Sequence, residues 1–230
     1  MTQPTSTDVR IPCDGILLSG TLSRPPRPRG IVAFAHGSGS SRLSPRNVYV
    51  AQVLFDAGFG ALLFDLLTQD EDRDYATRLD IDLLSDRLRG ATRWLRDEPQ
   101  AQGLPLGYFG ASTGAAAALV AAADPDSGVG AVVSRGGRPD LAGAQALGRV
   151  GAPTLLIVGG EDHEVIALNR SAYARLRCEK ELSIVPGATH LFEEPGTLEE
   201  VARQAAQWFT GHLAVPLAYR DPGVRPGSSS

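Results

Sequence analysis

Ser112 stands at the centre of a G-x-S-x-G pentapeptide, GASTG at residues 110–114, a pattern found around serine nucleophiles. An apolar run ending at Phe109 precedes the pentapeptide, and an alanine-rich segment at 115–123 follows it. A strand, a sharp turn and a helix in this order would lift the hydroxyl out of the sheet toward a base. In a chain with 26 glycines the pentapeptide alone also fits a loop that merely starts a helix. Its context decides, and we take Ser112 as the candidate nucleophile.

A second loop supplies the candidate acid. Residues 159–165 (GGEDHEV) follow an apolar strand and contain three carboxylates, of which Asp162 is the one that we expect to orient the base. Glu161 and Glu164 are then its solvated neighbours. An Asp that caps the following helix is the alternative, because Asp is a common N-cap residue.

A third loop supplies the candidate general base, His190, within residues 186–192 (PGATHLF). The other three histidines have different expected roles. His212 lies at a helix end, where it favours the helix dipole, and His163 adjoins the candidate acid on an exposed loop. His36 is expected to support the glycine-rich loop that contains it.

That glycine-rich loop, residues 35–41 (AHGSGSS), can point backbone N–H groups at a bound acyl oxygen. The negative oxygen of a tetrahedral intermediate needs two donors. We expect these to be the backbone N–H of Thr113, rather than its hydroxyl, and the N–H of Ser38, with Gly39 as the fallback. The rival interpretation is a phosphate cradle, but the chain has no P-loop Gly-Lys-Ser/Thr and lacks the third glycine of a dinucleotide fingerprint.

Arginines cluster near the same edge of the predicted sheet. Arg135 and Arg138 follow a strand in the segment 134–140 (SRGGRPD), and together with Arg42 and Arg46 they are candidates for binding a substrate carboxylate or phosphate. The alternative is that these arginines bridge loops by pairing with nearby carboxylates, namely Asp65, Asp70 and Asp140.

Short apolar runs alternate with longer periodic segments from residue 31 onward, which predicts βαβ crossovers and a mainly parallel sheet. The expected strands are 31–35, 60–65, 104–109, 129–133, 153–158 and 181–185. The expected helices are 47–57, 80–96, 113–123, 140–147, 166–177 and 198–211. An edge hairpin pairs 9–11 with 16–22 around Asp14-Gly15. The fold class is therefore α/β, with eight strands and about six helices.

The length of 230 residues suits one large α/β domain, which we expect to span residues 8–215. The segments 1–7 and 216–230 are expected to be mobile, because they are polar and poor in apolar residues. The last helix is expected to begin with a capping box in which the Thr197 hydroxyl and the Glu200 side chain satisfy reciprocal backbone N–H groups.

Composition excludes several classes of function. The net charge is −4, from 22 basic and 26 acidic residues without long blocks of one sign, so neither nucleic acid nor an anionic membrane surface is an expected partner. Cys13 and Cys178 lack metal-type spacing, which indicates reduced thiols and a cytoplasmic protein. The N-terminal residues lack the apolar core of a signal peptide, and no stretch is apolar enough for a membrane span. We expect a small-molecule ligand and no metal or organic cofactor. The sequence predicts no particular oligomeric state.

The motifs FAHGSGSSR, GYFGASTGAAAAL, GGEDHEV and PGATHLF together resemble the α/β-hydrolase superfamily, in the neighbourhood of dienelactone-hydrolase-like proteins, over roughly residues 8 to 212. Serine, then acid, then histidine is that superfamily's chain order. The resemblance implies an eight-stranded sheet whose second strand is antiparallel, with Ser112 as nucleophile, Asp162 as acid and His190 as base. Dienelactone hydrolases proper use a cysteine nucleophile, so a lactone-specific substrate does not follow from the resemblance.

We therefore expect a serine hydrolase that cleaves a small ester through an acyl-enzyme on Ser112. Only about twenty residues separate the strands 129–133 and 153–158, where many relatives insert a helical cap, so we expect little or no cap and an open site for short acyl groups. The alternatives are a non-catalytic small-ligand binding module on this fold, or a thioesterase, peptidase or cofactor-free perhydrolase with the same triad.

Overall fold

The computed structural model describes residues 5–213, and these contain one eight-stranded sheet with the order β1-β2-β4-β3-β5-β6-β7-β8. The strands are β1 Thr5–Cys13, β2 Ile16–Arg24, β3 Ile31–Ala35, β4 Gly60–Phe64, β5 Leu106–Ala111, β6 Val129–Arg135, β7 Thr154–Gly159 and β8 Lys180–Val185. Strand β2 runs antiparallel to both of its neighbours, and every pair from β4 to β8 is parallel. The predicted α/β class and the antiparallel second strand are confirmed.

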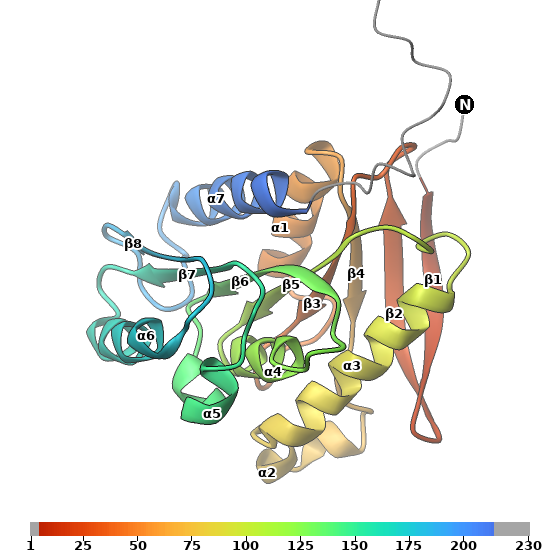
Figure 1. Ribbon diagram of the computed structural model, residues 1–230, viewed down its shortest axis with the longest axis horizontal. Helices are drawn as coiled ribbons and strands as arrows, with labels where there is room; N and C mark the ends of the chain where they lie inside the picture. The colour runs from red at the N-terminus through yellow and green to blue at the C-terminus, as the bar shows by residue number, and fades with distance from the viewer. Residues whose placement is uncertain (1–4, 214–230) are drawn as a thin grey trace, which may run out of the picture.

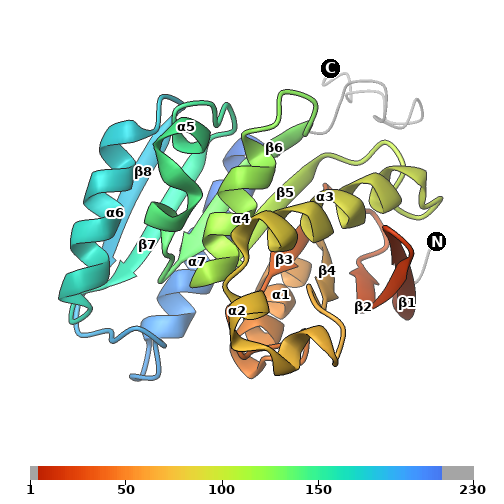
Figure 2. The ribbon, with the colours of Figure 1, turned by 90° about the horizontal axis from the view of Figure 1, so that it is seen from below.

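Helices cover both faces of the sheet (Figures 1 and 2). The helices in the described range are α1 Pro45–Asp56, α2 Tyr75–Arg78, α3 Ile81–Asp97, α4 Thr113–Ala122, α5 Gly143–Leu147, α6 His163–Arg175 and α7 Thr197–His212. Helices α1 and α7 pack on one face, and α3 to α6 pack on the other. The connection from β6 to β7 holds only a 3-10 turn, Pro139–Ala142, and the short helix α5, so no cap domain covers the sheet edge.

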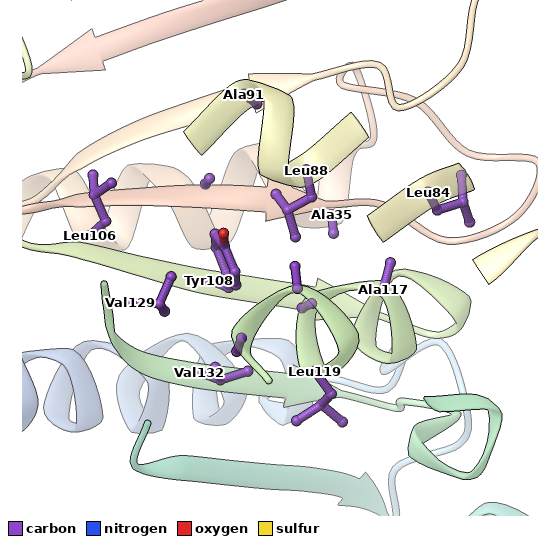
Figure 3. Packing of buried hydrophobic residues seen from close by; sticks show 14 of the residues in the cluster. Ala35, Leu84, Leu88, Ala91, Leu106, Tyr108, Ala117, Leu119, Val129 and Val132 are labelled. Atoms are coloured by element: carbon purple, nitrogen blue, oxygen red, sulfur yellow. The ribbon is translucent and has the colours of Figure 1, made fainter. Parts of the chain in front are cut away.

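The core on the α3–α6 face is built from large side chains of α3 and the sheet against very small side chains of α4 (Figure 3). Leu84, Leu88, Ala91 and Leu95 form one buried stripe along α3. The alanines of α4 at positions 115–118 are fully buried, which lets α4 lie close to both the sheet and α3. Helix α4 is thus held from two sides, and its first residues are fixed in space.

Most element boundaries lie within a few residues of those predicted, and the differences have local causes. The Asp14-Gly15 turn has φ of 47° and 84°, which matches the tight hairpin expected from the sequence. Helix α6 begins at His163 rather than at residue 166. The 3-10 turn Glu71–Arg73 and helix α2 were not predicted, since this charged segment carries no apolar periodicity.

The predicted capping box at the start of α7 is wrong. Gly196, with φ of 83°, occupies the N-cap position, and Thr197 is already helical. The Thr197 hydroxyl donates back to the Glu194 carbonyl at 2.7 Å, while the Glu200 carboxylate accepts from the side chains of Arg203 and Gln204. The left-handed glycine shifts the helix start, so the Thr197 hydroxyl no longer faces the free N–H groups.

At the N-terminus, strand β1 begins at Thr5, inside the segment 1–7 that was expected to be mobile. Residues 1–4 and the expected tail 216–230 lie outside the described residues. Between residues 5 and 213, no helix combines the length and the hydrophobicity that crossing a membrane requires.

Gly114 lies where α4 meets the chain leaving β3, and a methyl group there would overlap the carbonyl oxygens of Ala35 and His36. We therefore expect Gly114→Ala to lower the free energy of unfolding by about 2 kcal/mol or more. Gly211, a helical glycine of α7 with open space around it, provides the control. Gly211→Ala is expected to raise stability by about 0.5 kcal/mol, because alanine is the better helix former. Urea unfolding measures both changes, and equal effects at the two positions would contradict the packing argument.

Candidate active site

Ser112 forms the whole turn between β5 and α4 and has φ of 51° and ψ of −121°. A positive φ is rare for a residue with a side chain and persists only where surrounding contacts enforce it. Here the Ser112 N–H donates to the Arg135 carbonyl at 3.3 Å, and the Ser112 carbonyl accepts from the N–H groups of Ala115 and Arg138. A methyl group on Gly37 would lie 3.0 Å from Ser112 Cβ, a tight contact that the glycine avoids. The predicted strand, turn and helix are present around Ser112.

Asp162 and His190 are joined by a hydrogen bond in which His190 Nδ1 donates to Asp162 Oδ2 at 2.6 Å. Asp162 occupies the N-cap position of α6, yet its side chain makes no capping hydrogen bond. The Asp162 carboxylate therefore binds His190 and does not cap the helix, which was the alternative expected from the sequence. With the proton held on Nδ1, His190 Nε2 is left as the basic nitrogen.

The loop that carries His190 is anchored by contacts that sequence analysis did not identify. The Thr189 N–H and hydroxyl both donate to the Glu194 carboxylate, at 3.0 and 2.6 Å, and these hydrogen bonds lower the pKa of Glu194. The Glu161 N–H donates to the Ala188 carbonyl at 2.9 Å, which ties the acid loop to the histidine loop. Gly159 permits this contact, since a methyl group there would overlap Ala188 O.

The end of β6 connects the two halves of the site. Gly136, with φ of 51°, follows Arg135, whose carbonyl accepts from the Ser112 N–H. A methyl group on Gly136 would lie 3.0 Å from the His190 carbonyl oxygen and 3.7 Å from His190 Cε1. Ser112 and His190 thus flank the same short segment at the carboxyl edge of the sheet. Within residues 5–213 the Ser112 hydroxyl makes no hydrogen bond to His190, and such bonds often form only when substrate binds.

His36 fixes the glycine-rich loop, as predicted. It is 7% exposed, its Nδ1 donates to the Gly37 carbonyl and its Nε2 accepts from the Leu66 N–H, both at 3.0 Å. Burial lowers the pKa of His36, which agrees with a neutral ring that accepts at Nε2. The loop after β3 is thereby tied to the end of β4.

The two expected oxyanion donors do come together, but in an unexpected way. The Ser38 N–H donates to the Thr113 hydroxyl oxygen at 2.8 Å, so this amide already has a partner. Thr113 is the first residue of α4, where a backbone N–H has no intrahelical acceptor. The Thr113 side chain, 6% exposed, thus joins the start of α4 to the glycine-rich loop.

Three of the four arginines are paired. Arg138 binds Asp140 through two hydrogen bonds of 2.9 and 2.8 Å. Arg42 pairs with Asp65 at 2.6 Å, and Arg46 pairs with the exposed Glu193 at 3.3 Å. Pairing with nearby carboxylates, the alternative to substrate binding, therefore accounts for Arg138 and Arg42. In the described part of the chain, the side chain of Arg135 has no carboxylate partner.

The remaining histidines lie outside this arrangement. His163 is exposed at the start of α6, beside the exposed Glu161 and Glu164. His212 Nδ1 donates to the Trp208 carbonyl at 2.8 Å, its Nε2 lies 3.1 Å from Glu179 Oε1, and its ring packs on that of Trp208. Across residues 5–213, no group of three or more His, Cys, Asp or Glu side chains is placed to hold a metal ion.

A pocket of about 250 Å³ lies beside the loop 36–41. Its walls come from that loop, from the chain after β4 and from the 3-10 turn that follows, including Ser40, Asp65 and Thr68. Neither Ser112 nor Asp162 nor His190 belongs to these walls, so the pocket lies beside the candidate catalytic residues and does not enclose them.

Comparison with known proteins places the chain among hydrolases. The profile of the dienelactone hydrolase family matches residues 18–212. The crystal structure of dienelactone hydrolase from Anabaena variabilis ATCC 29413 is 56% identical, has a TM-score of 0.88, and covers 92% of this chain and 99% of its own. Est1E from Butyrivibrio proteoclasticus, at 16% identity and a TM-score of 0.75 over 89% of this chain and 98% of its own, shares the fold.

Two Mycobacterium tuberculosis proteins, from strains CDC 1551 and H37Rv, are each 60% identical over 209 residues. Both are provisionally named as phosphoribosyl transferases. The match covers 91% of this chain but 47% of each relative, so the chain spans about half the length of these curated relatives.

The backbone of Ser112 yields a stability prediction. We expect the free energy of unfolding of Ser112→Gly to be about 1 kcal/mol higher than that of Ser112→Ala. Glycine adopts a positive φ without the clash that a Cβ atom causes. Urea unfolding of the two variants measures the difference. The same pair of substitutions at Ser171, an exposed position of α6, is the control and should show the opposite order. An alanine variant at position 112 that matches or exceeds the glycine variant would contradict the strained turn.

Proposed function

The chain belongs to the dienelactone hydrolase family, and from this membership we propose that it is a serine hydrolase of the carboxylesterase type that cleaves a small ester. The observation that carries the proposal is that one edge of the sheet holds both the strained turn at Ser112 and an imidazole, that of His190, whose Nδ1 is held by Asp162. A serine forced out of the strand and a histidine with a free Nε2, at one sheet edge, supply the nucleophile and base that acyl transfer needs.

In the proposed reaction, His190 Nε2 takes the proton of the Ser112 hydroxyl while Ser112 Oγ attacks the ester carbonyl carbon. The tetrahedral intermediate collapses, the C–O bond to the alcohol breaks, and the imidazolium gives its proton to the departing oxygen. Asp162 stabilises the imidazolium and keeps the ring oriented. Water then attacks the acyl-enzyme with His190 again as base, which releases the acid and restores Ser112.

For the oxyanion hole we propose two donors on one residue, the backbone N–H and the hydroxyl of Thr113. The hydroxyl oxygen accepts from the Ser38 N–H, so its own proton is free to point to the developing oxyanion. Ser38 then acts by orienting the Thr113 hydroxyl instead of by touching the substrate. This assignment differs from the two-amide hole expected from the sequence, because the Ser38 amide is engaged.

The short connection between β6 and β7, which leaves this edge of the sheet open, supports a short or polar acyl substrate. The name of the M. tuberculosis relatives describes proteins of which this chain matches only 47%, whereas the dienelactone hydrolase profile matches residues 18–212 of the chain itself. A thioesterase, peptidase or perhydrolase would use the same residues and differ in the leaving group or acceptor. The free cysteines Cys13 and Cys178 support a cytoplasmic location.

Loss of the nucleophile tests the proposal directly. Ser112→Ala is expected to lower kcat on p-nitrophenyl butyrate by about four to six orders of magnitude, because the triad acts as a unit. A fluorophosphonate probe should label the wild type and should not label this variant. Ser171→Ala, at an exposed position of α6, is the control and should keep both activity and labelling. Near-normal turnover in Ser112→Ala would refute the assignment, and a folded wild type that resists the probe would favour the binding-module alternative.

Thr113→Val tests the oxyanion assignment, because valine keeps the shape of threonine and removes the hydroxyl. We expect kcat to fall by about 10²- to 10³-fold with little change in KM, as for loss of one oxyanion donor. Thr113→Ser restores a hydroxyl and should stay within about tenfold of the wild type. If Ser38 were the donor, Thr113→Val would free its amide and kcat would be maintained or raised.

A further inference from the structure

Arg135, the last residue of β6, is a buried cation without a counter-ion. It is 7% exposed, and within residues 5–213 its side chain forms no ion pair and no hydrogen bond. Its Nε is shielded from solvent and has no partner, whereas the two terminal nitrogens are not fully shielded. Removing a guanidinium from water without a partner is energetically costly, so a structure that keeps one there favours an anionic ligand.

The position of Arg135 places this charge at the candidate active site. Its carbonyl accepts from the Ser112 N–H, and its guanidinium carbon lies 6.0 Å from the ring centroid of Phe192, two residues after His190. Side chains alternate along a strand, so Arg135 shares its face with Val133, which packs in the core formed with α1 and α7. The guanidinium therefore lies at the catalytic edge, on the side of the sheet where α1 begins.

The surroundings of Arg135 add further positive charge. Arg46, the second residue of α1, is close enough that its charge adds to burial in lowering the pKa of Arg135 to about 10. Arg135 thus remains a cation at neutral pH. The only ion pair of Arg46 in the described range is with Glu193, whose side chain is 64% exposed, and such pairs are weak. The first turn of α1 contains no acidic residue, and the side chain that caps it is the neutral hydroxyl of Ser44, so no negative charge offsets the positive end of its dipole.

We propose that Arg135, supported by Arg46 and the N-terminus of α1, binds a phosphate group on the acyl part of the substrate. Two guanidinium groups and a helix end match a dianion with several acceptor oxygens better than a carboxylate with one charge. The acyl part is assigned because it stays on Ser112 through both steps, beside the backbone of Arg135. This inference rests on the proposed hydrolase function and names its substrate class. Arg138, bound to Asp140, takes no part.

Three p-nitrophenyl esters that differ only at the far end of a three-carbon acyl chain provide the test. The 3-phosphonopropanoate ends in a dianion, the hemisuccinate in a carboxylate and the butyrate in a methyl group. For the wild type we expect kcat/KM to fall in that order after correction for spontaneous hydrolysis. Equal values for the three esters would overturn the proposal, and a preference for the hemisuccinate would show that the site takes a carboxylate instead.

Variants assign the preference to its residues. Arg135→Gln is expected to lower kcat/KM for the phosphonate ester about 50-fold, as for loss of a buried charged partner, and that for the butyrate less than threefold. Arg46→Gln, at a more exposed position, should lower the phosphonate value about fivefold and keeps the test open if Arg135→Gln does not fold. Arg175→Gln removes the same charge at the far end of α6 and is the control. It should leave the ratio of kcat/KM for the phosphonate ester to that for the butyrate unchanged. Equal losses on all three esters in folded Arg135→Gln would mean a structural role only.

Inorganic phosphate separates this inference from the catalytic proposal. Phosphate should raise the midpoint of thermal unfolding of both the wild type and Ser112→Ala, because it binds the folded state, and it should not stabilise Arg135→Gln. If Ser112→Ala retained hydrolysis, the proposed function would fail while this binding remained measurable. If phosphate stabilised neither the wild type nor Ser112→Ala at concentrations up to those of the ester assays, the phosphate site would be refuted.

Discussion

A single residue in a left-handed conformation, Ser112, joins β5 to α4, and the geometry around the site depends on keeping it there. A positive φ at a residue with a side chain is unfavourable by itself, so the fold must hold both flanks. Strand β6 does this through the carbonyl of Arg135, and the loop after β6 does so through the amide of Arg138. Buried alanines hold α4 against the sheet, and glycines at 37 and 114 let the loop after β3 lie against the turn.

The same requirement for close approach shapes the loops that carry the acid and the histidine. Parallel strands β5, β6 and β7 end at one edge, which brings residues far apart in sequence near each other. Gly136 and Gly159 then allow the backbone of the histidine loop to contact β6 and β7. Glu194 closes that loop on Thr189, so the His190 ring that binds Asp162 is supported from its own backbone. The hydrogen bond between acid and histidine thus depends on two close backbone approaches and on the Glu194 carboxylate.

Electrostatics distinguishes the residues that stabilise loops from those available to a ligand. Arg42 and Arg138 each have a carboxylate partner, and His36 is buried and hydrogen-bonded on both nitrogens. These groups make the edge of the sheet rigid. Arg135 alone among the four arginines near the edge has no counter-ion in the described range, although it is the most buried of them. The paired arginines stabilise loops, whereas the buried and unpaired guanidinium of Arg135 is the one that we propose binds an anion.

The sequence by itself determined the α/β class, the order of the strands and the hairpin, because these follow from local periodicity and from turn residues. It also named Ser112, Asp162 and His190 as candidates, from their motifs and their order along the chain. Tertiary structure decided which polar groups meet. The Ser38 amide binds the Thr113 hydroxyl 75 positions away, Asp162 at a helix start turns to His190, and Arg135 is left unpaired while Arg138 is not. These pairings depend on the distance between two loops and on which backbone N–H and C=O groups still lack a hydrogen-bond partner. Residue types along the chain do not record those distances, since packing between distant segments sets them.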